Sequence, residues 1–193
     1  IGITALVGIL SVVSALDNTL SIQFAMLGFN TFSFTHHTLS LQMGGWRSEG
    51  KVNLIISWPQ AKAFATKYDS PSTQTSISFT ATSNAEVKFE SQKTDPDISV
   101  LGVDENFLTN SGSETTKGRN FTNFDISNNA FVCIVGSDFE NGLLKGVNPI
   151  DKISSVRGAK FRIIGVLKEK GSTFGNSQDL RVLIPIQSHG LYL

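Results

Sequence analysis

The first sixteen residues constrain this chain most, because IGITALVGILSVVSAL carries no charged side chain before Asp17. Folded as a helix, they would span about 24 Å, which is short of the ~30 Å hydrocarbon core of a bilayer. The run lacks a basic leading region and a small-residue cleavage signal, so it does not match a secretory signal peptide. It predicts the cut end of a longer transmembrane helix, and the alternative is a helix buried in a soluble core.

The helical pattern continues past Asp17 and predicts a stalk that leaves the membrane. Apolar side chains recur there at helical spacing, at Leu16, Leu20, Phe24 and Leu27. Gly28 is well placed just past the end of this helix. The following NTFSFT alternates, with Phe32 and Phe34 on one face, and predicts a half-buried strand.

Composition excludes some classes of protein. The 193 residues contain 16 Lys+Arg and 16 Asp+Glu, and no basic stripe of the kind that nucleic-acid binding needs. Charged residues make up only 17%, while Ser, Thr, Asn and Gly are plentiful, which favours a β-rich structure. Cys133 is the single cysteine, so an internal disulfide and a cysteine zinc cluster are impossible. It lies within FVCIVG, where we expect a buried small hydrophobe rather than a reactive thiol.

The middle of the chain predicts one helix and one hairpin. Ser57 and Gln60 form a capping-box pattern before the run AKAFATKY, and the apolar residues Trp58, Ala61, Phe64 and Tyr68 share roughly one face. The segment TSISFTATSNAEVKFES alternates on both sides of Ser83-Asn84. This predicts two strands of one hairpin, with the turn at those two residues.

The second half predicts further strands and a short helix. ISVLGV (98–103) and FVCIVG (131–136) are strands, and residues 104–130 are mostly loop. DFENGLLK is a short helix that Asp138 caps. KISSVRGAKFRIIGVL is a strand, a turn at Gly158 and a second strand. The order of these elements predicts an α+β fold.

The glycine-rich stretch KEKGSTFGNSQDL lacks the features of a nucleotide site. Its lysines precede the glycines, whereas a phosphate loop places a lysine directly after the last glycine, and no G-x-G-x-x-G opens a helix. Metal binding would have to use His36, His37 and His189, whose spacing matches no metal motif. We therefore predict no cofactor-binding and no metal-binding residues.

No set of residues predicts catalysis either. The neighbouring carboxylates Asp95/Asp97 and Asp104/Glu105 are typical turn formers. Ser154-Ser155 lie in a strand pattern without a G-x-S-x-G elbow. The triplet at Asn120 is a formal glycosylation sequon of a kind that is common by chance. The predicted list of catalytic residues is therefore empty.

Several blocks of the second half occur in a familiar order: VLGVDENFL, KGRNF, CIVGSDFENGLL, NPIDKISSVRGAKFRIIGVLKEKGSTFG and RVLIPI. Together they resemble the periplasmic core domain of MacB-type ABC transporter permeases, a group that includes FtsX-like permeases. The resemblance begins at IGITALVGILSVV, continues through LGFNTFSF and ends at Ile186.

This resemblance implies a domain inserted between the first two of four transmembrane helices. The implied fold is α+β: a porter-like α/β subdomain made of two segments, with an inserted, mostly β, Sabre-like subdomain. We expect the transmembrane helix and stalk at 1–28, an incomplete porter-like part at 29–96 and 178–193, and the insertion at 97–177. The glycine stretch becomes a solvent loop, in which Gly171 and Gly175 supply backbone freedom.

The resemblance also implies a function. The domain would be non-catalytic, would lie on the periplasmic side of the inner membrane, and would transmit ATP-driven motion through a helical lever at residues 1–27 during export of antimicrobials or peptides. Implied partners are an ABC ATPase subunit or domain, a periplasmic adaptor protein and a second permease in a homodimer or heterodimer, with no nucleic acid. The alternatives are a lipoprotein-releasing permease domain, a small-ligand-binding module, and a hydrolase using Ser154, His36 or the Asp pairs.

Overall fold

The computed structural model describes residues 31–35, 56–68, 73–173, 176–177 and 179–187. The chain divides into two compact units, Ile1–Ala63 and Phe64–Leu193, and the β-sheet belongs to the second. The predicted transmembrane and stalk segment at 1–28 lies outside the described residues. Among the helices that are described, none is both long enough and apolar enough to cross a membrane.

The short segment 31–35 differs from its prediction. It has no regular secondary structure, and Phe32 and Phe34 are 65% and 67% exposed. Their rings meet edge to face with centroids 5.4 Å apart. The prediction of a half-buried strand was wrong here, because an alternating pattern does not by itself supply a neighbouring strand to complete the hydrogen bonds.

Helix α2, Trp58–Lys67, confirms the predicted helix and its first turn. The backbone N–H of Ser57 donates to Oε1 of Gln60 at 2.9 Å, which is half of a capping box. The apolar side chains remain largely accessible: Phe64 is 45% and Tyr68 41% exposed, and their rings stack 5.4 Å apart.

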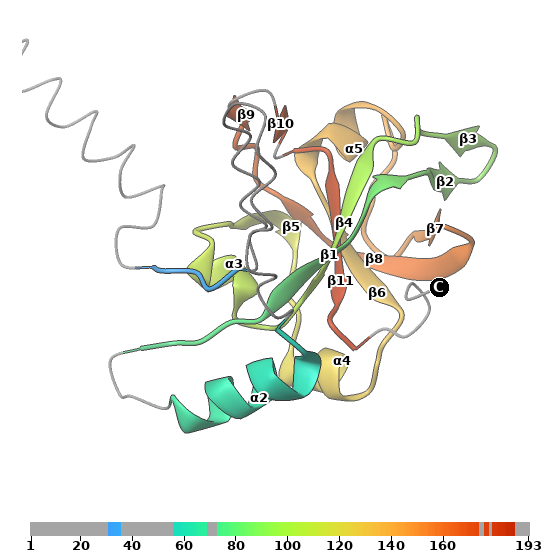
Figure 1. The fold of residues 1–193 in the computed structure, drawn as a ribbon. Coiled ribbons are helices and arrows are strands. Elements are labelled where there is room, and N and C mark those ends of the chain that lie inside the picture. The colour runs from blue at the N-terminus through green and yellow to red at the C-terminus, as the bar shows by residue number, and fades with distance from the viewer. Residues whose placement is uncertain (1–30, 36–55, 69–72, 174–175, 178, 188–193) are drawn as a thin grey trace, which may run out of the picture. The chain divides into compact units, whose positions relative to one another are not determined.

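The second unit is built mainly from strands (Figure 1). The strands are β1 Ser78–Ala85, β2 Val87–Phe89, β3 Gln92–Lys93, β4 Ile98–Val103, β5 Thr115–Gly118, β6 Val132–Val135, β7 Ile153–Val156, β8 Ala159–Leu167, β9 Ser172–Thr173, β10 Asn176–Ser177 and β11 Arg181–Pro185. Three short helices lie between them: α3 Phe107–Asn110, α4 Asn123–Ser127 and α5 Ser137–Asn141.

Nine of these strands form one mixed sheet. Its order is β1-β4-β11-β6-β8-β7-β2-β3, and β5 pairs with the second half of β8. β4 runs parallel to β11 and β6 runs parallel to β8, while the other pairings are antiparallel. β9 and β10 form a separate two-stranded hairpin. The predicted α+β class is therefore confirmed.

The central strands are buried on both faces. In β6, Cys133 and Val135 belong to one core cluster, and Val132 and Ile134 belong to the other. Alternate residues of a strand point to opposite faces, so the two clusters lie on opposite sides of the sheet. Phe139 of α5 and the following Leu144 complete the first cluster, whereas Leu108 of α3 and Ile126 of α4 complete the second.

The predicted hairpin around Ser83-Asn84 was wrong. β1 continues through these two residues to Ala85 and pairs with β4, while β2 pairs with β7 and β3. The chain turns instead between β2 and β3, where Glu90 has a φ of +52°. Alternation correctly indicated extended chain, but the choice of partner depends on distant residues that a local pattern does not contain.

The predictions for the second half of the chain are partly confirmed. β4, β6 and the β7–turn–β8 unit are confirmed, and the turn contains Gly158 with a φ of +90°. Helix α5 exists, but its N-cap is Gly136 rather than Asp138. The prediction that residues 104–130 are mostly loop missed three short elements, α3, β5 and α4, which hold 13 of these 27 residues.

The predicted division into subdomains stays a prediction. The sheet joins β4, which falls in the proposed insertion at 97–177, to β1 and β11, which fall in the proposed porter-like segments. Gly171 has a φ of +76°, which agrees with its expected role in backbone freedom. Gly175 lies outside the described residues.

Candidate functional site

The single cysteine is an inert core residue. Cys133 has no exposed surface and packs in the first core cluster. Burial raises the pKa of its thiol to about 12, so the reactive thiolate is scarce at neutral pH. The prediction of a buried small hydrophobe is confirmed.

Asp104 works as a turn former, as predicted. Its carboxylate accepts hydrogen bonds from the Ser76 hydroxyl at 2.6 Å and from the backbone N–H of Ile77 at 2.6 Å. The backbone N–H of Asn106 donates to the same carboxylate at 3.2 Å. Burial raises the pKa of Asp104, and these hydrogen bonds oppose that shift. The carboxylate ties the loop before β1 to the loop after β4.

The candidate nucleophile and the sequon are both engaged in structural contacts. Ser154 is 3% exposed, and its hydroxyl donates to the carbonyl of Lys88 at 3.2 Å. The Asn120 amide donates to the carbonyl of Glu105 at 3.0 Å and accepts from the N–H of Phe121 at 2.7 Å. Both side chains therefore hold neighbouring segments together.

The remaining candidates do not converge. Asp95 and Asp97 are exposed in the turn before β4. His36, His37 and His189 lie outside the described residues. Within the described part of the chain, no group of three or more His, Cys, Asp or Glu residues is arranged to hold a metal ion.

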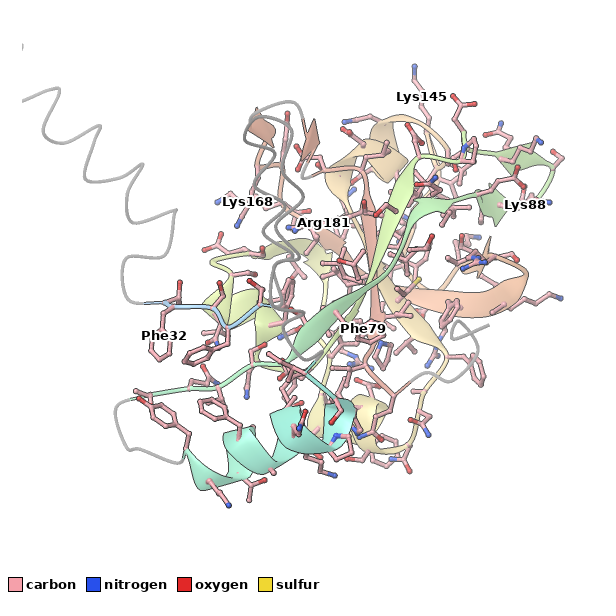
Figure 2. The ribbon with its side chains drawn as sticks, in the orientation of Figure 1. Phe32, Phe79, Lys88, Lys145, Lys168 and Arg181 are labelled. Carbon is pink, nitrogen blue, oxygen red and sulfur yellow. The ribbon has the colours of Figure 1, made fainter. Side chains whose placement is uncertain are left out.

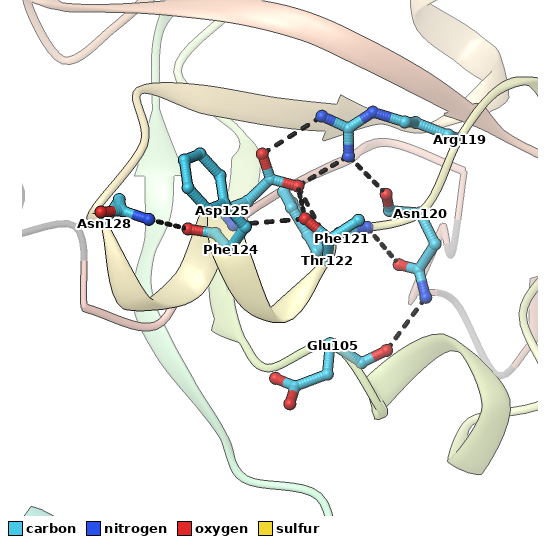
Figure 3. Close-up of polar contacts among 8 residues, drawn as sticks. All are labelled: Glu105, Arg119, Asn120, Phe121, Thr122, Phe124, Asp125 and Asn128. Carbon is cyan, nitrogen blue, oxygen red and sulfur yellow. Dashed lines mark hydrogen bonds and ion pairs between the residues drawn. The ribbon is translucent and has the colours of Figure 1, made fainter.

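The most concentrated polar network surrounds α4 (Figure 3). Both terminal nitrogens of Arg119 donate to the two carboxylate oxygens of Asp125, at 2.6 and 3.1 Å. Thr122 and Asp125 complete a reciprocal capping box: the Thr122 hydroxyl accepts from the N–H of Asp125, and the Asp125 carboxylate accepts from the N–H of Thr122. Asp125 is only 5% exposed.

This network anchors the loop before α4 to the sheet. The backbone N–H of Arg119 donates to the carbonyl of Ile164 in β8 at 2.9 Å. The hydrogen bonds from the Arg119 guanidinium, aided by those from Thr122, hold the pKa of the Asp125 carboxyl well below its usual range. The sequence prediction missed this network, although Thr122-x-x-Asp125 matches the capping-box pattern that signals a helix start.

We expect Asp125→Asn to lower the free energy of unfolding by about 1–3 kcal/mol at neutral pH, because it removes a charge-assisted pair. A carboxyl whose folded-state pKa is depressed stabilises the fold above its unfolded-state pKa of about 4, and that stabilisation is lost as pH falls through the lower folded-state value. Urea unfolding of wild type and variant should therefore converge as pH falls below about 4.

Glu114→Gln is the matched control for this prediction. Glu114 pairs with Lys168 at 3.0 Å, but both side chains are exposed, so its loss should change stability by less than about 1 kcal/mol. A difference between wild type and Asp125→Asn that stays constant from neutral to strongly acidic pH would contradict the assigned role of the carboxylate.

The described geometry is that of a scaffold: a mixed sheet with helices on both faces and polar networks that join loops. The crystal structure of the periplasmic region of MacB from Actinobacillus actinomycetemcomitans has a similar fold, with a TM-score of 0.53 and 17% sequence identity. The likeness covers 66% of this chain and 55% of that one. At this level of identity it supports the α+β fold alone.

Sequence comparison supplies the family. The sequence model of one protein family, the MacB-like periplasmic core domain, matches residues 1–193. The chain therefore belongs to this family. A macrolide export ATP-binding/permease protein MacB from Bdellovibrio bacteriovorus is 24% identical over 186 residues, which is 96% of this chain and 28% of that protein. A pyoverdine export ATP-binding/permease protein PvdT from Pseudomonas fluorescens is 33% identical over 96 residues, which is 49% of this chain and 15% of that protein.

The family assignment fixes the class and the location of the chain. It is a non-catalytic, periplasmic domain of an inner-membrane, MacB-like ABC permease, as the resemblance implied. The chain spans only about a quarter of the first of these relatives, 28% of its length. The activities in the relatives' names therefore belong to much longer proteins.

Proposed function

We propose that this chain transmits ATP-driven conformational change from the membrane to the periplasm during export. The match to the periplasmic core domain along the whole chain carries this proposal. The central strands support it physically, because a sheet packed on both faces is stiff and moves as a body rather than deforming. The proposed lever that drives it is the segment 1–27, which lies outside the described residues.

The partners follow from the same proposal. Relatives carry ATP-binding and permease parts in one protein, which supports an ABC ATPase subunit or domain as the motor. The working unit would be a homodimer or heterodimer of permeases, with a periplasmic adaptor protein as a further contact. The relatives' names, macrolide export and pyoverdine export, favour export of antimicrobials or peptides over lipoprotein release as the role of the whole transporter.

The subdomain organisation belongs to the same proposal. A porter-like part at 29–96 and 178–193 would carry the stalks, and the Sabre-like part at 97–177 would extend from it. The Arg119–Asp125 network lies in the latter segment and would keep its loops fixed during motion.

Spin labels in the assembled exporter test whether the domain moves as a body. Cys133 is buried and its thiol pKa is raised, so labels can be placed at Lys93→Cys and Lys145→Cys without removing Cys133. With ATP trapped, the distance between Lys145 labels on the two permeases should change by about 5 Å or more. The Lys93–Lys145 distance within one chain should stay constant.

Two results would contradict the proposal. One is an unchanged distance between permeases in a preparation that exports substrate. The other is a change within the chain as large as the change between chains, since that would describe a deforming domain instead of a transmitting one.

A further inference from the structure

One face of the sheet carries basic side chains on β2 and β8, on either side of β7. Lys88 lies opposite Ser155, Ser155 lies opposite Lys160, and Ile153 lies opposite Arg162. Directly paired residues, and residues two apart on one strand, point to the same side of a sheet. We call these five residues, Lys88, Ile153, Ser155, Lys160 and Arg162, the basic face.

The other side of the same strands is core. Val87, Val156 and Phe161 alternate with the residues of the basic face, and all three have no exposed surface. The orientation of the basic face is therefore fixed by apolar burial, because a slip by one residue would place lysines in the core.

The helices that cover this side of the sheet stop short of the basic face. Val132, which lies opposite Arg162 on β6, is 3% exposed and packs in the second core cluster with Ile126 of α4. Further out, Ile153 of β7 is 60% exposed, and Lys160 of β8 is exposed as well.

The basic face has more positive charge than nearby carboxylates neutralise. Lys88 shares Glu86 with Lys93, at 3.0 and 3.3 Å. Arg162 meets Asp151 only at 3.8 Å, with both side chains more than half exposed. Among the residues that the structure describes, Lys160 has no carboxylate within ion-pair distance. Because the whole chain has a formal charge of zero, this local excess results from where the residues are placed.

The basic face ends in an open groove. The groove has a volume of about 420 Å³, and its lining includes Lys88 and Ser155 of the face together with Glu86 and Arg157. Figure 2 shows Lys88 on β2, on a different part of the surface from Lys145 and Lys168. This concave site combines cations, one carboxylate and the neighbouring apolar Ile153. A polypeptide segment with acidic and apolar side chains suits such a site better than a flat, uniformly anionic membrane does.

We propose that the basic face docks an acidic segment of a periplasmic protein partner. Carboxylates of the segment pair with Lys160 and Arg162, and an apolar side chain between them packs on Ile153. This inference rests on the proposed function only in taking the partner to be a protein in the periplasm. The charge complementarity comes from the residues of the face.

A defined peptide tests this surface without ATP or transport. The probe is a fluorescein-labelled peptide of alternating Glu and Leu, and its matched control has Gln in place of every Glu. Fluorescence anisotropy with the full chain should show binding of the Glu peptide at low ionic strength. We expect loss of that binding near 0.5 M salt, where the Debye length falls to about 4 Å. The Gln peptide should bind at least about tenfold more weakly.

Two charge-reversal variants locate the binding. Lys160→Glu/Arg162→Glu should weaken binding of the Glu peptide by about tenfold or more. Lys145→Glu/Lys168→Glu makes the same change in net charge elsewhere on the surface and should leave the affinity within about twofold of wild type. Circular dichroism checks that both variants keep the fold.

Each other outcome overturns the proposal. It fails if the Glu peptide does not bind, if both peptides bind equally, or if both variants lose affinity equally. It also fails if Lys160→Glu/Arg162→Glu lowers binding to phosphatidylglycerol vesicles but not to the peptide, which would assign the face to lipid. A permease that binds the peptide at this face yet shows no ATP-linked motion would instead contradict the proposed function alone.

Discussion

Replacing Gly118 with alanine is expected to destabilise the chain by about 2–5 kcal/mol, the sum of a backbone penalty and a steric one. Gly118 has a φ of +77°, a conformation that costs residues with a Cβ about 1–2 kcal/mol. The added Cβ would also lie 2.1 Å from the carbonyl oxygen of Ile164 and 2.9 Å from the Cα of Gly165. Since both contacts are with backbone, relief requires β5 to separate from β8. Urea unfolding measures the loss.

Gly146→Ala separates the two causes. Gly146 has nearly the same φ, +78°, but a Cβ there would meet nothing within 4 Å. This variant should lose only the backbone penalty of about 1–2 kcal/mol. Equal destabilisation of the two variants would contradict this explanation. It would mean that the close approach of β5 and β8 at Gly118 adds no steric penalty.

The strands that the sequence predicted correctly are those that local pattern determines. ISVLGV, FVCIVG and AKFRIIGVL are apolar runs bounded by turn residues, and they became β4, β6 and β8. Such runs are long and apolar enough to be buried wherever they pair. Gly158 likewise identified its turn, because a positive φ is a local requirement.

The errors of the sequence prediction concern which strands pair with each other. Alternation around Ser83-Asn84 predicted a hairpin, but β1 pairs with β4 and β2 pairs with β7, across long sequence separations. The row of charged residues that forms the basic face was also invisible, because it exists only once three strands are aligned in register. By contrast, the Thr122–Asp125 capping box was visible in the sequence, within a region predicted as loop.

Inserting Gly-Gly after Thr19 in the full permease is expected to reduce export to near background while ATP hydrolysis continues. The proposed lever, residues 1–27, transmits force only if it stays a continuous helix, whose internal hydrogen bonds are satisfied in lipid and in water alike. Two glycines cost about 2 kcal/mol of helix stability and introduce a flexible point. Efflux of the exported compound and phosphate release from the same vesicles measure the two activities.

An Ala-Ala insertion at the same position is the matched control. It lengthens and rotates the segment by the same amount but keeps the helix stiff, because alanine is the strongest helix former. Membrane levels of both variants, compared by immunoblot, separate a coupling defect from poor expression. Export should be greater with Ala-Ala than with Gly-Gly.

The number of molecules exported per ATP hydrolysed is the quantity that tests this account most directly. We expect the ratio to fall to near zero with Gly-Gly and to stay closer to wild type with Ala-Ala. An unchanged ratio with Gly-Gly, at normal membrane levels, would contradict the claim that this periplasmic domain is driven through a rigid helical connection.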